Sequence, residues 1–195
     1  MILLADKITN LTAARYFAAK GAEWLFFDPS SISIPEIQAI RGWVEGPRSG
    51  LYLPLGSDSM DKEILAQIQP EGFMLGHFAD RQSRIDGLPF FKEWRPERGD
   101  DPASLVEMMA AWPEAEAQLL RLEEWSNADI LALLAAVPED MQLIISTTPD
   151  AFQQGVEVVR DVAGICLVAP PEEEVGLVSF DHIDEALDAL EGYLF

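Results

Sequence analysis

Short apolar runs alternate along the whole chain with longer stretches in which apolar residues recur every three or four positions. The apolar runs are rich in β-favouring residues and return at intervals of roughly 25 residues, which is typical of compact βα units. Eight runs are predicted to be strands, at residues 2–4, 23–27, 50–53, 72–75, 88–91, 117–122, 142–146 and 164–168. Strands that alternate with helices in this number predict an α/β protein folded as a single (β/α)8 barrel, the TIM barrel.

The stretches between the strands have the apolar faces of helices that pack on a barrel. Ala13 and Phe17 lie on one face of the first helix, and Ile37 and Ile40 lie on one face of the second. Six more helices are predicted, at residues 59–68, 80–84, 104–112, 127–136, 149–160 and 180–193. The longest predicted loop, residues 95–102, follows the fifth strand, at the end of the barrel where ligands bind in this architecture.

The composition is that of a globular protein. Of the 195 residues, 49% are hydrophobic, and no linker divides the chain, so residues 1–195 are predicted to form a single domain. No apolar run approaches the roughly 20 residues of a membrane span. Asp6 also interrupts the apolar start where a secretory signal needs a continuous one. We therefore expect a cytoplasmic protein.

The chain is strongly acidic, with a formal net charge of −21 at pH 7. This charge repels phosphate backbones and anionic headgroups, so neither nucleic acid nor a membrane surface is an expected partner. A small anionic ligand is still compatible with it, because helix N-termini and one or two arginines can attract an anion inside a cleft. The apolar residues 193–195 could cover the barrel or join a dimer, so a monomer and a homodimer both stay open.

Cysteine and histidine are scarce. The single cysteine, Cys166, excludes an internal disulfide, and the two histidines, His77 and His182, form no cluster with the spacing of zinc ligands. No metal and no cofactor are predicted. Cys166 lies in an apolar strand with no base beside it in sequence, which favours a small core residue over a nucleophile.

Motifs near the strand ends carry a family resemblance. Residues 5–10 read Ala-Asp-Lys-Ile-Thr-Asn, and residues 24–31 read Trp-Leu-Phe-Phe-Asp-Pro-Ser-Ser. They resemble the Lys-Val-Cys-Gly-Ile-Thr opening and the Gly-Phe-x-Phe-x-Pro-x-Ser strand and loop of phosphoribosylanthranilate isomerase, the sugar-phosphate isomerase of tryptophan biosynthesis. In this resemblance Asp6 and Lys7 stand in place of the family's Cys-Gly pair, whose cysteine is catalytic.

The resemblance extends to later strands. Residues 72–77, Gly-Phe-Met-Leu-Gly-His, stand where the family has a Gln-Leu-His-Gly strand end. Residues 117–121, Ala-Gln-Leu-Leu-Arg, are similar to its Leu-Leu-Asp strand end, so Arg121 occupies the place of the general acid. Residues 164–172 match Gly-Val-Asp-Val-Ser-Ser-Gly-Val-Glu, with Val-Ala-Pro in place of Ser-Ser-Gly. The resemblance implies the barrel fold and an intramolecular aldose–ketose isomerisation.

The candidate catalytic positions are Asp6, Arg121 and His77. An isomerisation of this type needs a base that removes a proton and an acid that protonates the ring oxygen. Asp6 could be the base if burial raised its pKa, or it could cap a helix or pair with Lys7. The guanidinium of Arg121 keeps its proton and cannot be the acid. We expect Asp6 and Arg121 to form a salt bridge across the barrel mouth. His77 could transfer a proton or be held by loop backbone.

The resemblance implies a phosphate site at the loops after the last two strands, where glycines let backbone N–H groups approach the anion. Proline has no N–H group, so Pro170 weakens this site. The ligand-binding positions that remain are Lys7, Thr147, Thr148 and Ala169.

A second candidate for anion binding lies above the fifth strand. Lys92, Arg95 and Arg98 could hold an anion there, or they could belong to a solvated loop with acidic partners. Trp94 and Trp125 could line a pocket or pack in the core.

Two functions are compatible with these residues. The first is a phosphoribosylanthranilate isomerase-like barrel that has lost the sugar-phosphate isomerase activity and acts as a non-catalytic small-molecule-binding or regulatory protein. The second is an enzyme: either phosphoribosylanthranilate isomerase or a related sugar-phosphate isomerase with a rearranged acid–base pair, or another isomerase or lyase that reuses Asp6 and His77. A mouth plugged by Arg121, Met74 and Pro170 would favour the first function, and an open mouth the second.

Overall fold

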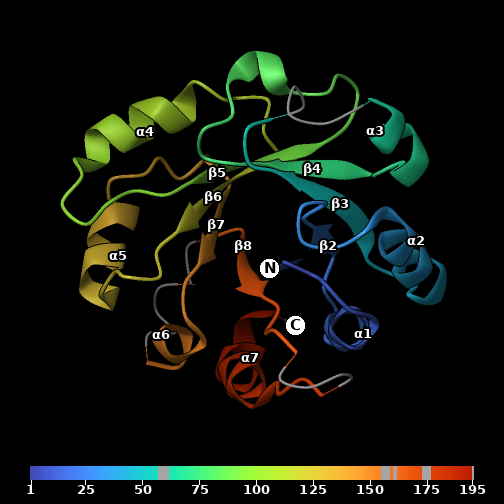
Figure 1. The fold of residues 1–195 in the computed structure, drawn as a ribbon. Helices are drawn as coiled ribbons and strands as arrows, with labels where there is room; N and C mark the ends of the chain where they lie inside the picture. Colours follow the sequence, from blue (N-terminus) through green and yellow to red (C-terminus); the bar gives the residue numbers. More distant parts are fainter. Residues whose placement is uncertain (57–61, 155–158, 160–161, 173–176, 195) are drawn as a thin grey trace.

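Eight parallel strands close into a barrel in a computed structural model of the protein, and the helices surround it (Figure 1). The structure describes residues 1–56, 62–154, 159, 162–172 and 177–194. Each strand pairs with the next one in sequence, and β8 pairs with β1, which places Asp6 opposite Val168. The predicted TIM barrel is therefore confirmed.

All eight predicted strands form. They are β1 (Ile2–Asp6), β2 (Trp24–Phe27), β3 (Arg48–Leu53), β4 (Gly72–Leu75), β5 (Phe90–Trp94), β6 (Ala117–Arg121), β7 (Leu143–Ser146) and β8 (Gly164–Val168). The observed bounds differ most from the predicted ones at β5, which was expected at residues 88–91. Gly87 has φ +85° and Pro89 has no N–H group to give to a neighbouring strand, so the strand begins after them and continues to Trp94.

The helices lie outside the barrel and follow the strands. They are α1 (Leu11–Ala19), α2 (Ile34–Trp43), α3 (Lys62–Ile68), α4 (Pro102–Ala110), α5 (Asn127–Leu134), α6 (Pro149–Gln154) and α7 (Asp181–Leu194). The fourth predicted helix, at residues 80–84, is only the short 3₁₀ helix η2 (Arg81–Ser83). Residues 59–61, 155–158 and 160, which also belong to predicted helices, lie outside the described residues.

Local side-chain contacts fix where several helices begin. Asn10 Oδ1 accepts a hydrogen bond from Ala13 N at 2.7 Å at the start of α1. Asp101 does the same for Ser104 N at 3.1 Å at the start of α4, directly before Pro102. These contacts satisfy N–H groups that have no partner within the helix. None of the described helices is long and apolar enough to span a membrane.

Aromatic side chains fill the amino-terminal half of the barrel interior. The rings of Trp24 and Phe26 stack with centroids 5.5 Å apart, and Phe91 meets both rings edge-on at 5.6 Å. Glycines on the next strands make room for them, since a Cβ on Gly50 would lie 2.3 Å from the Phe26 ring and one on Gly72 would lie 2.5 Å from the Trp24 ring. These close contacts leave no room for a side chain at Gly50 or Gly72 in this half of the interior.

Candidate functional site

Polar side chains replace apolar ones in the interior at the carboxyl ends of the strands. Side chains of a strand alternate between the interior and the helix layer, and Asp6 of β1, Glu93 of β5, Arg121 of β6 and Ser146 of β7 meet one layer beyond the aromatic rings. All four are buried, and Glu93 has no exposed surface. Charged groups are seldom buried without partners, and here the partners are one another.

Arg121 lies at the centre of this polar layer. Its Nη2 forms an ion pair with Asp6 Oδ2, and its Nε lies 3.3 Å from Glu93 Oε2. Its Nη1 donates to Ser146 Oγ at 3.0 Å. The salt bridge expected between Asp6 and Arg121 is therefore confirmed, and it joins residues from β1 and β6 across the barrel.

Two sulfur atoms complete the surroundings of the guanidinium. Arg121 Nη2 lies 3.6 Å from Met74 Sδ, and Nη1 lies 3.9 Å from Cys166 Sγ. Burial raises the pKa of Cys166 to about 12, so this side chain is a neutral thiol at pH 7. Burial opposes the charge on Arg121, but the carboxylates of Asp6 and Glu93 raise the pKa of Arg121 above its ordinary value. Arg121 therefore keeps its positive charge while its side chain fills the barrel interior at the strand ends.

Asp6 is held on both carboxylate oxygens and through its backbone. While Oδ2 pairs with Arg121, Oδ1 accepts a hydrogen bond from Lys7 N at 2.7 Å, and the carbonyl oxygen accepts one from Ala169 N at 2.8 Å. Lys7 takes the left-handed φ of +54°, which brings its N–H group back to Asp6. Lys7 and Ala169 were predicted ligand-binding positions. The backbone N–H groups of both donate hydrogen bonds to Asp6.

Glu93 is the central site residue that the sequence prediction missed. Its Oε1 lies 2.5 Å from Arg95 Nε and accepts a hydrogen bond from Tyr52 Oη at 3.3 Å. Burial and the Glu93 carboxylate raise the pKa of Tyr52 to about 12. The sequence did contain a signal for Glu93. It is two residues after Phe91, and because side chains alternate along a strand, both point into the barrel interior. The predicted strand ended at residue 91 and so left Glu93 outside it.

His77 lies at the end of β4 and is bound to loop backbone. Its Nδ1 accepts a hydrogen bond from Arg95 N at 3.2 Å. Burial and the positive charge of Lys92 lower the pKa of His77, so the ring is neutral at pH 7. Among the described contacts of His77, none joins it to Asp6 or Arg121.

Lys92 does not line the mouth, which corrects the prediction that it could hold an anion there. It alternates with Glu93 and therefore faces the helix layer, where its Nζ donates to the carbonyl oxygens of Gly76 at 2.5 Å and His77 at 2.9 Å. The same nitrogen lies 4.7 Å from the ring centroid of Trp94 and 5.0 Å from that of Trp112. Trp94 likewise packs in this layer.

Thr147 and Thr148 both have internal roles. Thr147 Oγ1 donates to Leu122 O at 3.2 Å, and Thr148 Oγ1 accepts from Ala151 N at 3.3 Å at the start of α6. Thr148 also borders a hollow of about 330 Å³ between the first residues of α6 and α7. Pro170 lines this hollow, and the described polar contacts of Arg121 include Met74 but not Pro170.

A cleft of about 670 Å³ lies above the strand ends of β4, β5 and β6, and we call it the mouth cleft. Its lining combines three arginines, three glutamates, a histidine and two aromatic residues. The lining residues are His77, Phe78, Arg95, Pro96, Glu97, Arg98, Arg121, Glu123, Glu124 and Trp125. The predicted loop after β5 supplies the central part of this lining, while Arg121 connects the cleft with the polar layer.

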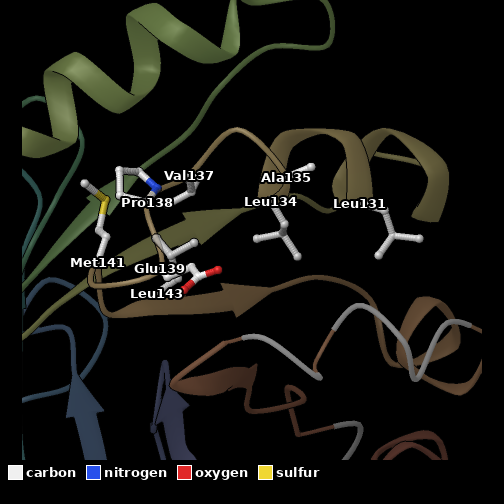
Figure 2. A pocket seen from close by; sticks show the side chains of 8 residues that line it. All are labelled: Leu131, Leu134, Ala135, Val137, Pro138, Glu139, Met141 and Leu143. Atoms are coloured by element: carbon white, nitrogen blue, oxygen red, sulfur yellow. The ribbon is translucent and has the colours of Figure 1, made fainter.

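Another hollow, of about 590 Å³, lies beside α5 and the turn that leads into β7 (Figure 2). Figure 2 shows mostly apolar side chains around it, including Leu134, Val137 and Met141. Glu139 is its one titratable lining residue. Because it borders the amino-terminal end of β7, it lies away from the polar layer. Within the described part of the chain, no group of three or more His, Cys, Asp or Glu residues could hold a metal ion.

The sequence matches no protein family model and no curated protein. Solved structures do match. Phosphoribosyl anthranilate isomerase from Thermus thermophilus has a TM-score of 0.74 and 18% identity, with 98% of this chain and 99% of that chain covered. A monomeric form of the Thermotoga maritima isomerase gives 0.73 and 16%, with 98% and 100% covered. The chain has a fold similar to that of phosphoribosylanthranilate isomerase.

A third match is a solved structure of the same isomerase with a ligand bound. A phosphoribosyl anthranilate isomerase in complex with reduced 1-(o-carboxyphenylamino)-1-deoxyribulose 5-phosphate has a TM-score of 0.71 and 15% identity, with 98% of this chain and 100% of that chain covered. TM-scores of 0.71–0.74 over 98% of the chain establish the shared barrel, and identities of 15–18% show no more than the fold. Activity depends on the particular residues at the mouth.

Proposed function

We propose that this protein is a phosphoribosylanthranilate isomerase-like barrel that does not catalyse the isomerisation and instead binds a small molecule at its mouth, as a binding or regulatory protein. The observation that carries the proposal is the position of Arg121. It fills the interior at the strand ends and engages both buried carboxylates, Asp6 and Glu93.

The proton chemistry supports this proposal. An aldose–ketose isomerisation needs groups that give and take a proton near pH 7. Arg121 keeps its proton because its pKa is raised, and the Cys166 thiol is buried and has a pKa of about 12. Asp6 has Arg121 on one oxygen and the N–H group of Lys7 on the other, so its carboxylate has no free oxygen aimed at a substrate.

The test is an assay for the inherited reaction. Purified protein is mixed with phosphoribosylanthranilate, and the loss of its fluorescence is followed; in parallel, the gene is expressed in a tryptophan auxotroph that lacks the isomerase. We expect no turnover above the uncatalysed rate and no growth, while an authentic isomerase in the same vector restores growth. Turnover or growth would overturn the proposal, provided that circular dichroism shows folded protein.

A second candidate is an active isomerase with a rearranged acid–base pair. It is favoured by the placement of Asp6 and His77 at strand ends of the same mouth, in a fold similar to an isomerase that binds a sugar phosphate derivative. In that case Asp6→Asn and His77→Gln would each abolish a measurable turnover. A turnover that survives both substitutions would exclude this pair.

A further inference from the structure

We propose that the amino-terminal end of the barrel, between α4 and α5, is a docking site for a basic amphipathic helix of a partner protein. The partner helix places apolar side chains in two neighbouring hollows and lysine or arginine side chains beside the acidic groups around them. This site lies at the end of the barrel opposite the mouth. It is therefore an additional function that does not depend on the one proposed for the mouth.

Two hollows adjoin at this end of the barrel, and Met141 lines both. The first, of about 590 Å³, is the one shown in Figure 2, and we call it the α5 hollow. The second, of about 300 Å³, lies beside the end of α4, where Met109 and Trp112 border it, and we call it the α4 hollow. The turn of residues 137–142 contributes to both. A helix laid across this turn reaches both hollows, because side chains three, four and seven positions apart lie along one helix face.

Apolar side chains around the hollows are open to solvent. Leu131 lines the α5 hollow and is 39% exposed, and Met108 of α4 is 46% exposed. Leu134 and Met141 are only partly buried. Methionine side chains adapt their shape to a partner, and apolar grooves of this kind receive the apolar face of a helix.

Two acidic side chains set the charge of the expected partner. Glu139 lines the α5 hollow and Asp140 lines the α4 hollow. Both are exposed, and none of the ion pairs among the described residues includes either one. In Figure 2 the Glu139 carboxylate extends from the turn into the space that Leu134 also borders. Such a surface is complementary to a partner that combines apolar contact with positive charge.

Two helix ends add to the negative field. The last residues of α4 border the α4 hollow, those of α5 border the α5 hollow, and neither helix has a basic residue in its last turn. The carboxyl-terminal end of a helix carries a partial negative charge that attracts cations. Residues 99–154 include eleven Asp and Glu residues, and their one Lys or Arg is the buried Arg121. The surface therefore attracts a basic partner and repels a second copy of this chain.

The first arm of the test measures binding of a synthetic helix to the full chain. The probe is a fluorescein-labelled peptide of sequence LKKLLKLLKKLLKL, which places leucine on one helix face and lysine on the other. Fluorescence anisotropy at an ionic strength of about 0.15 M follows the binding. We expect saturation with a Kd on the order of 10 μM.

Two control peptides separate the apolar face from the charge. A peptide of the same composition in scrambled order has the charge without the apolar face, and a peptide with glutamate at each lysine position has the face without the positive charge. Each should bind at least about tenfold more weakly. Equal binding of the scrambled peptide would overturn the proposal.

The second arm locates the site through exposed residues. Glu139→Lys should weaken binding of the leucine–lysine peptide about tenfold, and Leu131→Gln about fivefold. Glu45→Lys is the control for charge, since Glu45 follows α2 on the other side of the barrel from α5 (Figure 1) and lies outside both hollows. Leu55→Gln is the control for apolar surface, since Leu55 is 59% exposed and also lies outside them.

Both control variants should change the affinity by less than about twofold. Circular dichroism checks that each variant is folded. Equal weakening by Glu139→Lys and Glu45→Lys would mean that the peptide follows the overall charge of −21 instead of a defined site, and the proposal would be wrong.

Other occupants of the hollows give different results. If a second copy of the chain fills them, sedimentation shows a dimer that Leu131→Gln dissociates. If they take a small apolar cation, hexylamine binds in ligand-observed NMR while the peptide does not. Either result would overturn the proposal, and neither depends on the outcome of the isomerase assay.

Discussion

Asp6, Arg121, Glu93 and Arg95 form a chain of alternating charges that balances to zero at the barrel mouth. Three of its members are buried, and the fourth, Arg95, reaches solvent. A buried ion pair adds little stability relative to an apolar pair, but the removal of one partner leaves the other charge uncompensated. The position of Arg121 in the middle makes it the member on which both carboxylates depend.

We predict that Arg121→Met lowers the free energy of unfolding by about 3–5 kcal/mol, because Asp6 and Glu93 lose their shared buried partner. Urea denaturation measures the change. The matched control is Arg98→Met, which removes an exposed ion pair with Asp129 and should change stability by less than about 1 kcal/mol.

The triple variant Arg121→Met, Asp6→Asn, Glu93→Gln separates the loss of the Arg121 ion pairs from the loss of Arg121 side-chain packing. It removes the uncompensated charges, so it should recover a large part of the stability that Arg121→Met loses. Equal stability of Arg121→Met and the wild-type protein would show that the polar layer needs no cation.

Lys92 is also buried, but its ammonium group is surrounded by carbonyl oxygens and aromatic rings rather than by carboxylates. Burial lowers the pKa of Lys92 from 10.5 to about 8. Between these two values the unfolded chain holds the proton and the folded chain releases it. The unfolded state therefore binds more protons in this window, and Lys92 makes stability rise with pH there.

The pH prediction compares the wild-type protein with Lys92→Met, which has no proton to release at this position. The difference in unfolding free energy, wild type minus variant, should be constant below about pH 7 and should increase as the pH rises from about 8 towards 10. Urea titrations at several pH values measure it. A difference that stays flat across this range would mean that Lys92 keeps its ordinary pKa in the folded protein.

At the scale of the elements, the pairing of large and small residues on neighbouring strands decides how the interior is filled. Gly50 of β3 lies against the Phe26 ring of β2, and Gly72 of β4 lies against the Trp24 ring. A side chain at either glycine would need the space that a ring already occupies. The aromatic half of the barrel is thus specified jointly by β2, β3 and β4.

We predict that Gly50→Ala destabilises the protein by about 1–3 kcal/mol, because the new Cβ would lie 2.3 Å from the Phe26 ring. Gly42→Ala on α2 is the control, since a Cβ there has nothing within 4 Å and alanine favours a helix by up to about 1 kcal/mol. The two substitutions should shift the urea midpoint in opposite directions. A shift in the same direction for both would contradict the packing argument.

Elements also show where sequence patterns suffice. The alternation of apolar runs located all eight strands, because a parallel barrel strand is buried on both faces and is therefore largely apolar. β5 departs from this rule, since Lys92 and Glu93 are charged and buried. An apolar pattern ends at Phe91 for that reason, and the prediction lost the last part of the strand together with Glu93.

For the whole molecule, barrel closure brings together residues that no local pattern relates. Asp6 and Arg121 are 115 positions apart, and their contact was foreseen only because both were placed at strand ends by the family resemblance. The contact of Arg121 with Glu93 needed the register of β5 and β6, which the sequence pattern leaves undetermined. That residues 1–195 form one domain stays a prediction. Whether the protein is a monomer or a homodimer also stays open. The apolar residues 193–195 bear on that second question, and their side chains lie outside the described part of the chain.

The alternating charges at the mouth also bear on how the protein can evolve. Arg121→Asp, which would put an acid at position 121, would by itself place three carboxylates around the barrel axis. Each first step away from the present arrangement passes through a less stable protein. Substitutions at the exposed loop residues of the mouth cleft are therefore expected to cost less stability than substitutions in the buried layer.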